Sequence, residues 1–298
     1  IFTIIGPGDN FLSVLPIHHT FETTCGQLAP FYMGSSITYA ESLKSYVIIE
    51  NMQKTKVSVM CGVPLLYKIF FEGIIREAEA KGIVIKLLFK LLFFISRVVR
   101  ALTGKNIGRK LFGMVHKKLG GRIKFWVSGG AAIDPGIIDG YDLIGLTILQ
   151  GYGLTETSPI LTCCTLDDNK IGSVGSAIEG VLLKIDNPDQ NGIGEIIAQG
   201  PNIMKGYFKK PDVTAEVIRD GWFYTGDLGF IDRAGHVYIT GRIKDVIISG
   251  AGLNVYPEEI ERELDKLPMI LESCALGRKI KEGVRRGMEE IIVLVIPD

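Results

Sequence analysis

Residues 150–159 have the sequence QGYGLTETSP and directly follow the apolar run of residues 143–149. Gly151 and Gly153 would let backbone amides approach a bound molecule closely, because glycine has no side chain. Between them, Tyr152 offers a flat ring on which a purine could stack. Loops at the carboxyl ends of strands form the usual ligand crevice of an α/β sheet, so we expect a binding loop here.

Two further side chains of the same stretch suit phosphates. The hydroxyl of Thr155 can donate a hydrogen bond to a phosphate oxygen. Glu156 is a hard oxygen ligand for Mg²⁺, which usually takes only one or two protein carboxylates together with phosphate oxygens. Taken alone, the stretch could also be an ordinary turn that carries polar residues.

A second glycine-rich turn, WVSGGAAIDP, covers residues 126–135 and leads from a strand to a helix that starts near Asp134. Such a loop can lie flat against a base or take phosphates near the helix N-terminus. It is not a phosphate loop of the Walker type, because no Gly-Lys-Ser/Thr follows the glycines.

Residues 220–229, DGWFYTGDLG, place a single carboxylate, Asp227, between glycines on an expected tight turn. A carboxylate can accept two hydroxyl protons at once, which suits the 2′- and 3′-hydroxyls of ribose. Arg242 follows a later strand and offers a permanent, forked donor to ribose or phosphate oxygens. The alternatives are a plain hairpin turn at Asp227 and a surface ion pair between Arg242 and Asp245. The order and spacing of all these stretches favour one nucleotide site over unrelated turns.

Short apolar runs alternate with helical patterns from residue 11 to about residue 153. The expected strands cover residues 11–15, 57–60, 122–127 and 146–149, and the expected helices cover residues 39–51, 64–81 and 85–102. This alternation predicts an α/β fold, with a mostly parallel sheet flanked by helices. The sheet subdomain is expected to span residues 1–162.

The pattern changes after residue 162. Glycines, prolines and short strand patterns at residues 181–185, 194–198, 230–231 and 236–239 indicate a small antiparallel, β-barrel-like subdomain over residues 163–242. A helix opening at Pro257 and ending at Pro268, and strand patterns at residues 273–277 and 290–296, predict a partial α+β C-terminal domain over residues 243–298.

The composition excludes several classes of protein. The 33 basic and 33 acidic residues balance, so we expect no nucleic-acid partner. The five cysteines and four histidines lack metal-binding spacing, and scattered thiols are typical of a reducing compartment. We therefore expect a cytoplasmic protein, or one bound peripherally to the inner face of the membrane.

The segment of residues 81–124 is unusually basic, because it contains no Asp or Glu and many Lys and Arg residues among apolar ones. Its charges interrupt the apolar run too often for a membrane-spanning helix, which needs ~20 mostly apolar residues. A basic amphipathic helix can lie on an anionic membrane surface, so peripheral membrane contact is one interpretation. The other is a helix that packs on the sheet and exposes a solvated basic face.

Three stretches, GYGLTETSP, YTGDLG and GRIKDVIISGAGLNVYPEEIE, resemble successive core motifs of the adenylate-forming superfamily. That superfamily contains acyl-CoA synthetases, peptide-synthetase adenylation domains and beetle luciferases. LPIHHT at residues 15–20 resembles an earlier motif, and GPNIMKGYF at residues 200–208 resembles the linking motif. The resemblance covers essentially the whole chain. LPIHHTFE and the basic insertion are most similar to bacterial long-chain fatty acyl-CoA synthetases.

The resemblance implies a role for each matched position. The positions that would contact ATP are Gly130, Ala131, Ala132, Gln150, Gly151, Tyr152, Gly153, Thr155, Asp227, Ile239 and Arg242, of which the first three would line the adenine site. Tyr152 would stack on the base, Thr155 would contact phosphate, and Glu156 would hold Mg²⁺. Asp227 would bind the ribose hydroxyls, with Arg242 assisting there.

Other matched positions relate to the acid, the hinge and CoA. His19 matches the histidine near the acyl-binding site, although a neutral core histidine is the alternative. Lys244 falls at the hinge about which the small C-terminal domain rotates between two half-reactions. The SGAG stretch of residues 249–252, with Gly250 and Gly252, resembles the loop that lines the pantetheine tunnel.

The implied reaction joins a long-chain fatty acid to CoA by way of an acyl-adenylate, with ATP and Mg²⁺. The superfamily's phosphate loop and its late catalytic lysine are not among these residues, so we expect a fragment of a longer ligase that is inactive alone. The alternatives are a ligase that loads a carrier protein, and a non-catalytic remnant that binds nucleotide or lipid.

Overall fold

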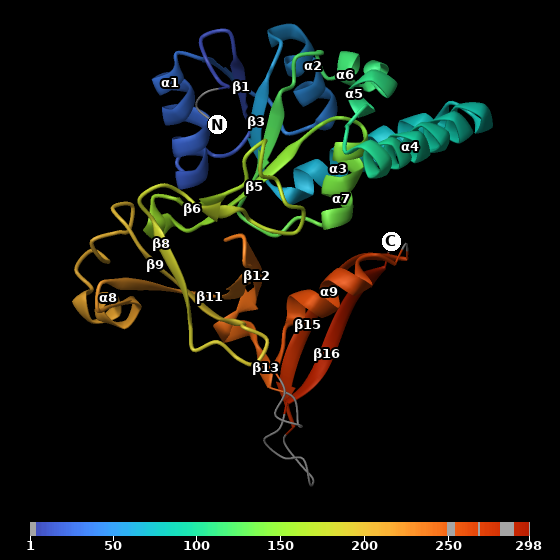
Figure 1. Ribbon diagram of the computed structural model, residues 1–298. Helices are drawn as coiled ribbons and strands as arrows, with labels where there is room; N and C mark the ends of the chain where they lie inside the picture. Colours follow the sequence, from blue (N-terminus) through green and yellow to red (C-terminus); the bar gives the residue numbers. More distant parts are fainter. Residues whose placement is uncertain (1–3, 249–253, 268, 281–288, 298) are drawn as a thin grey trace. The chain divides into compact units, whose positions relative to one another are not determined.

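The computed structural model describes residues 4–248, 254–267, 269–280 and 289–297 of the 298-residue chain (Figure 1). By internal contacts the chain divides into two compact units, Ile1–Ile178 and Glu179–Asp298. The first unit holds a mostly parallel sheet with its helices, and the second holds smaller antiparallel sheets. The fold class predicted from the sequence is thereby confirmed.

The sheet of the first unit has the strand order β2-β1-β3-β4-β5-β6-β7. The strands are β1 (Asn10–Ser13), β2 (Ser36–Tyr39), β3 (Val59–Gly62), β4 (Phe125–Ser128), β5 (Ile148–Gly153), β6 (Ile160–Cys163) and β7 (Ser176–Ala177). Strands β1 to β5 pair in parallel, whereas β6 and β7 are antiparallel additions. The chain passes from β1 to β2 on one side and then to β3 on the other. Such a reversal of strand order marks the usual ligand site of an α/β sheet.

Alternate residues of the parallel strands form two hydrophobic cores, one on each face of the sheet. One core contains Leu12, Met60, Trp126 and Ile148, and the other contains Phe11, Val59, Phe125 and Leu149. Successive side chains of a strand point to opposite faces, so strands buried on both faces read as continuous apolar runs. This is why the sequence identified these strands.

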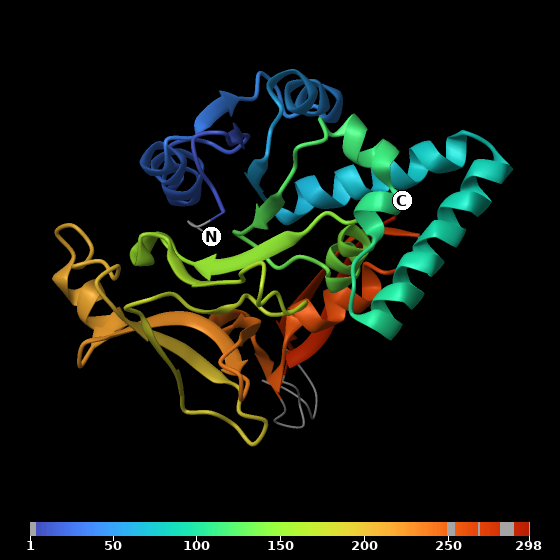
Figure 2. The same ribbon diagram turned by 45° about the horizontal axis from the view of Figure 1, so that its top comes forward.

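The helices of the first unit are mostly amphipathic segments between the strands. They are η1 (Glu22–Leu28, a π-helix), α1 (Ala29–Met33), α2 (Ser45–Thr55), α3 (Pro64–Ala80), α4 (Ile83–Thr103), α5 (Gly108–Leu111), α6 (Gly113–Lys118) and α7 (Pro135–Leu143). Tyr67 of α3 stacks on Trp126 with ring centroids 5.3 Å apart, and Tyr141 of α7 meets the same indole edge-on at 5.2 Å. Figure 2 shows α4 on the outside of the unit, with α3 and α7 between it and the sheet.

The sequence missed the short strands β2, β6 and β7. Strand β2 has the sequence SITY and is largely exposed at the sheet edge, so it lacks the apolar run that marks a buried strand. The expectation of a loop from residue 150 onward was wrong in its first part, because β5 continues through Gly153. Its last residues pair with β6, and this pairing keeps the backbone extended there.

The second unit begins with a five-stranded antiparallel sheet. Its strands are β8 (Leu182–Asp186), β9 (Gly194–Gln199), β10 (Ile218–Arg219), β11 (Trp222–Ile231) and β12 (Val237–Arg242), and α8 (Pro211–Val217) precedes β10. The order is β10-β11-β9-β8, with β12 also paired to β11. The expected tight turn at Asp227 is wrong, because this residue lies inside the ten-residue strand β11. Bulges in β11 accommodate the glycines there, and Gly226 has a positive φ of 74°.

The remainder of the second unit follows the predicted α+β pattern. Its elements are η3 (Ile243–Asp245), β13 (Ile247–Ile248), β14 (Asn254–Val255), α9 (Pro257–Leu264), β15 (Ile270–Lys279) and β16 (Glu289–Pro297). Helix α9 begins at Pro257 as predicted but ends at Leu264, and Pro268 lies outside the described residues. The division into residues 1–162, 163–242 and 243–298 stays a prediction, although β6 and β7 complete the first sheet.

Candidate functional site

The candidate site of the first unit lies at the carboxyl edge of the parallel sheet. Strands β1, β3, β4 and β5 run in the same direction, so the segments that follow them meet at one edge. These segments contain His19, the Gly130–Ala132 turn and the stretch from Leu154 to Glu156, and Tyr152 lies in the last residues of β5. Strand pairing places Ser128, at the end of β4, opposite Gln150 of β5. The sheet therefore brings the predicted residues of this unit to a common edge.

Contacts between these segments confirm that they are neighbours. Gly129 packs against the ring of Phe21, since a Cβ atom on this glycine would lie 3.2 Å from the ring. Val63, which follows β3, lies beside Gly130. Gly130 has a φ of 85°, a backbone conformation that favours glycine, and Ala131 and Ala132 are exposed. The turn is therefore shaped by glycine and leaves small side chains open to a ligand.

In the turn between β5 and β6, one threonine hydroxyl is buried and hydrogen-bonded within the turn, and another is exposed. Leu154 N donates to Thr157 Oγ1 at 2.9 Å, and the Thr157 hydroxyl donates to the carbonyl of Pro159 at 2.7 Å. Thr157 is buried and shapes the turn η2 (Thr155–Thr157), whereas Thr155 is exposed and Glu156 is half-buried. The two residues predicted to meet phosphate and Mg²⁺ are thus the accessible ones.

Gly153 is required by the hairpin itself. A Cβ atom at this position would lie 1.7 Å from the carbonyl oxygen of Pro159. We expect Gly153→Ala to lower the free energy of unfolding by about 1–3 kcal/mol, because the backbone must shift to relieve the overlap. Urea unfolding measures this, with Gly8→Ala as the matched control, since a Cβ atom there meets nothing within 4 Å. Equal stability of the two variants would contradict the prediction.

His19 lies in the segment after β1 and is exposed, so the alternative of a core histidine is wrong. Its Nδ1 atom accepts a hydrogen bond from the backbone N–H of Phe21 at 3.3 Å. The Thr23 N–H donates to the carbonyl of His19 at 2.9 Å, which anchors the histidine to the helix that follows. The imidazole is held by the backbone and remains accessible at the sheet edge.

Glu22 is a polar residue at this edge that the sequence reasoning did not single out. It is completely buried in the π-helix η1, and π-helical turns often occur at functional sites. Gln27 Nε2 donates to Glu22 Oε1 and to Ser13 Oγ, both at 3.3 Å, while Tyr39 Oη donates to Gln27 Oε1 at 2.7 Å. Burial raises the pKa of Glu22, and hydrogen bonds from Ser13 and Gln27 to its carboxylate oppose this effect. The sequence signal that could have identified Glu22 is its position in LPIHHTFE, three residues after His19.

The raised pKa of Glu22 predicts a pH-dependent stability. The folded chain favours the protonated carboxyl of Glu22. Its contribution to the free energy of unfolding is therefore complete below the ordinary glutamate pKa, and it is lost as pH rises through the raised pKa of the folded state. We expect Glu22→Gln to flatten this dependence and to be more stable than the wild type at neutral pH. Denaturant unfolding at about pH 4 to 8 measures it. Exposed Glu41→Gln is the control, and a wild-type–variant difference that does not change with pH would refute the prediction.

The candidate site of the second unit is the pair Asp227 and Arg242. The two residues are opposite each other on β11 and β12, and Arg242 Nε donates to Asp227 Oδ1 at 2.7 Å. The Asp227 carboxylate is 9% exposed and the Arg242 side chain is 43% exposed. The backbone N–H of Asp227 donates to Thr225 Oγ1 at 3.1 Å. Arg242 thus fixes one carboxylate oxygen of a nearly buried aspartate.

The other predicted positions of the second unit are less fully determined. Ile239 is half-buried on β12 and pairs with Gly229. Lys244 is exposed on η3, directly after β12, and its role as a hinge stays a prediction. Gly250 and Gly252 lie outside the described residues. Whether Tyr152, Glu156 and Asp227 meet across the two units stays a prediction.

The residues present fit a nucleotide and a magnesium ion. Ser128, directly before the Gly130 turn, is buried, and its hydroxyl has no hydrogen-bond partner among the described residues, so a polar ligand atom could satisfy it. The described part of the chain contains no group of three or more side chains that could hold a metal ion by themselves, so Glu156 would hold the ion as a single protein ligand. A single carboxylate suits Mg²⁺ bound mainly through phosphates.

Comparison with known proteins gives consistent matches. A family model described as AMP-binding enzyme matches residues 2–208. The peroxisomal long chain acyl-CoA synthetase 7 of Arabidopsis thaliana is 30% identical over 285 residues, covering 91% of this chain and 40% of the relative. The chloroplastic long-chain-fatty-acid–[acyl-carrier-protein] ligase AEE15 of the same plant is 29% identical over 347 residues, covering 96% of this chain and 45% of the relative.

A solved structure agrees with the sequence matches. The ATP-bound crystal structure of MatB from Rhodopseudomonas palustris superimposes with a TM-score of 0.75 at 29% identity, covering 100% of this chain and 52% of MatB. The chain thus spans about half the length of the proteins it matches. Because the family model covers more than half of these residues, the chain belongs to the AMP-binding enzyme family.

Proposed function

We propose that the chain is part of an ATP-dependent acid–thiol ligase that converts a long-chain fatty acid to its acyl-adenylate and then to a CoA thioester. The observation that carries this proposal is the gathering of the His19 segment, the Gly130 turn and Glu156 at one edge of the sheet. The chain's similarity to a long chain acyl-CoA synthetase supports a long-chain fatty acid as the substrate. We place the protein in the cytoplasm or on the inner face of the membrane.

The first half-reaction needs positioning more than covalent chemistry by the protein. A carboxylate oxygen of the fatty acid attacks the α-phosphorus of ATP, the bond to the bridging oxygen breaks, and pyrophosphate leaves. Tyr152 and the Gly130 turn would hold adenine, while Asp227, held by Arg242, would accept hydrogen bonds from ribose hydroxyls. A bound Mg²⁺, held by Glu156, would neutralise phosphate charge.

The second half-reaction transfers the acyl group. The thiolate of CoA attacks the acyl carbon of the adenylate, the bond to the phosphate oxygen breaks, and AMP leaves. In the superfamily, the small C-terminal domain rotates between the two half-reactions. A rotation about Lys244 would therefore turn a different part of that domain toward the reaction centre for the second step. Exposed Lys244, at the end of the β11–β12 hairpin, can absorb such a backbone change without disturbing a core.

The test of this proposal uses the full-length protein that contains these residues. Fatty-acid-dependent exchange of labelled pyrophosphate into ATP measures the first step, and acyl-CoA formation measures the second. We expect exchange with long-chain fatty acids, and thioester only after CoA is added. Exchange with none of a panel of fatty, aromatic and dicarboxylic acids would overturn the assignment to acid activation.

A carrier-protein-loading ligase is the second candidate, favoured by the similarity to a long-chain-fatty-acid–[acyl-carrier-protein] ligase. Both enzymes would show the same exchange reaction, so only the acceptor distinguishes them. Thioester formation on a phosphopantetheinylated carrier protein but not on free CoA would establish this alternative. Nucleotide binding without exchange would instead indicate the non-catalytic remnant.

A further inference from the structure

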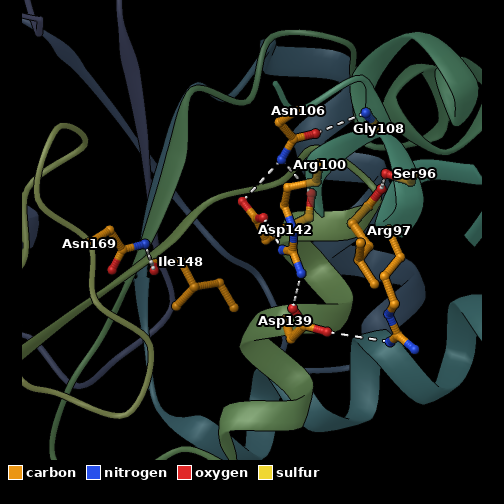
Figure 3. Close-up of polar contacts among 10 residues, drawn as sticks. Ser96, Arg97, Arg100, Asn106, Gly108, Asp139, Asp142, Ile148 and Asn169 are labelled. Atoms are coloured by element: carbon orange, nitrogen blue, oxygen red, sulfur yellow. Dashed lines mark hydrogen bonds and ion pairs between the residues drawn. The ribbon is translucent and has the colours of Figure 1, made fainter. Parts of the chain in front are cut away.

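Polar contacts on the inner side of helix α4 fix its orientation. The Ser96 hydroxyl donates to the carbonyl of Leu143 at 2.7 Å, and the Arg100 guanidinium contacts both Asp139 and Asp142 of α7 (Figure 3). These carboxylates are about 29% exposed and the arginine 28%, so the pairing is partly shielded from water. The contacts determine which side of α4 faces the first unit.

Aromatic packing reinforces this orientation. Phe89 and Phe93 of α4 and Phe112 form a cluster with ring centroids 5.1–5.2 Å apart. Phe112 is part of the buried core, whereas Phe89 and Phe93 are half-buried and packed against it. The inner side of α4 thus supplies the apolar side chains that pack against the core.

The outer side of α4 is also apolar. Spacings of four, four and three residues place Ile83, Leu87, Leu91 and Phe94 on one face, and their exposed fractions are 68%, 60%, 52% and 65%. Leu102 extends this face and is 80% exposed. A surface helix of a globular protein normally presents polar residues outward, so this face is a candidate contact surface. Within the described residues of the first unit, no other element covers it.

Basic side chains border the apolar outer face. Residues 82–121 contain no Asp or Glu. A crevice of about 300 Å³ between α3 and α4 is lined by apolar side chains that include Phe93 and Phe94, and by the charged residues Glu79, Lys86, Lys90 and Arg97. Lys86 pairs with Glu79 and Arg97 with Asp139, but Lys90 is exposed and makes no ion pair within the described part of the chain. Glu79 also interacts electrostatically with Lys90, so three basic side chains and one acidic one line the crevice. The surface therefore combines apolar side chains with a net positive charge.

We propose that the outer face of α4 binds the surface of an anionic lipid bilayer, with its apolar residues among the acyl chains and its lysines at the headgroups. Anionic lipids attract basic segments electrostatically, and a helix with an apolar face can lie in the membrane plane. Among the described residues no helix has the length and apolar composition to cross a bilayer, so the contact is peripheral.

The charge distribution favours lipid over a second copy of the chain. In a two-fold dimer the same patch contacts itself, which would bring Lys90 near its own counterpart in a segment that offers no acidic residue. An anionic bilayer supplies the missing negative charge without any change in the protein. This inference rests on α4 alone and is independent of the proposed ligase activity.

Flotation with lipid vesicles tests the proposal, with the full-length protein that contains these residues. We expect binding to phosphatidylcholine vesicles that contain phosphatidylglycerol, weaker binding to pure phosphatidylcholine, and a decline with added salt. Lys90→Glu should lower the partition coefficient about 30-fold, from two charge units at about 1 kcal/mol each. Phe94→Ser should lower it about tenfold through lost apolar burial.

Two matched controls carry the same substitutions elsewhere on the surface. Phe208→Ser changes a phenylalanine that is 86% exposed, and Lys44→Glu reverses an exposed lysine before α2. Both should bind vesicles as the wild type does. Wild-type binding by Lys90→Glu and Phe94→Ser, or no binding to anionic vesicles at low salt, would overturn the proposal.

The other occupants of this face give different results, each of which overturns the proposal. If α4 faces a second copy, Phe94→Ser should convert a dimer to a monomer in light scattering and leave vesicle binding unchanged. If another part of the protein covers α4, Phe94→Ser should lower the midpoint of denaturant unfolding clearly below that of Phe208→Ser. A lipid contact predicts unfolding midpoints equal to the wild type for both variants.

Discussion

Replacing Asp227 with asparagine should reduce kcat/KM for ATP by about 10- to 150-fold, mainly through a higher KM. This range corresponds to the loss of a hydrogen bond to a charged group, worth about 1.5–3 kcal/mol. The carboxylate is nearly buried, and Arg242 holds its Oδ1 atom at 2.7 Å, so the geometry is set before ATP arrives. Asparagine retains the size of the side chain but removes the charge that Arg242 pairs with.

A deoxynucleotide comparison links this effect to ribose. The wild type should use 2′-deoxy-ATP and 3′-deoxy-ATP less well than ATP, because each lacks one hydroxyl donor to Asp227. Asp227→Asn should lose most of this preference, since the two changes remove the same interaction. Asp220→Asn is the matched control, because Asp220 is an exposed carboxylate in the same DGWFYTGDLG stretch. An Asp227→Asn enzyme that discriminates deoxynucleotides as the wild type does would exclude the ribose role.

Replacing Glu156 with glutamine should lower the rate of acyl-adenylate formation about 100- to 1,000-fold, the usual cost of removing one group that stabilises transition-state charge. Glu156 is half-buried in the turn after β5, where Thr157 fixes the backbone through its bonds to Leu154 and Pro159. The substitution therefore changes the proposed metal ligand and keeps the Thr157 hydrogen bonds that hold the turn. No group of three or more metal-binding side chains in the described residues could replace it.

The magnesium dependence of the rate tests the role of Glu156 separately. Glutamine is a weaker ligand for a hard cation, so Glu156→Gln should require more Mg²⁺ for half-maximal exchange. Glu41→Gln, an exposed glutamate of the same unit, should retain both the rate and the Mg²⁺ requirement. A reduced rate with an unchanged Mg²⁺ requirement would show that Glu156 acts on the reaction without binding the metal.

Several parts of the proposed site could be predicted from residue types and spacing. The small residues from Gly130 to Ala132 suit contact with a base. The neighbouring pair Thr155 and Glu156 suits phosphate and Mg²⁺, so both features could be predicted from residue types alone. The structure adds the distinction between Thr155 and Thr157, which are equivalent in sequence. Only the second is buried and bonded to its own turn, so only the first remains open to a ligand.

The sequence by itself determined the order of the buried parallel strands and the long helices of the first unit, because a strand buried on both faces is a continuous apolar run and a helix repeats every 3.6 residues. Both signals are local and need no knowledge of the partner elements. Short strands such as β2, exposed at the sheet edge, carry no such signal and were missed. Asp227 was misplaced in a turn because flanking glycines signal a turn and a β-bulge alike.

The tertiary structure decided which polar groups meet and which surfaces stay open. Arg242 reaches Asp227 only because the pairing of β11 with β12 places the two residues opposite each other. Glu22 became a buried acid only because η1 packs against β1 and β3. The outward apolar face of α4 follows from the inner contacts of Ser96 and Arg100, which no pattern within the helix specifies. Burial and pairing depend on residues distant in the chain, so they emerge only when the elements pack together.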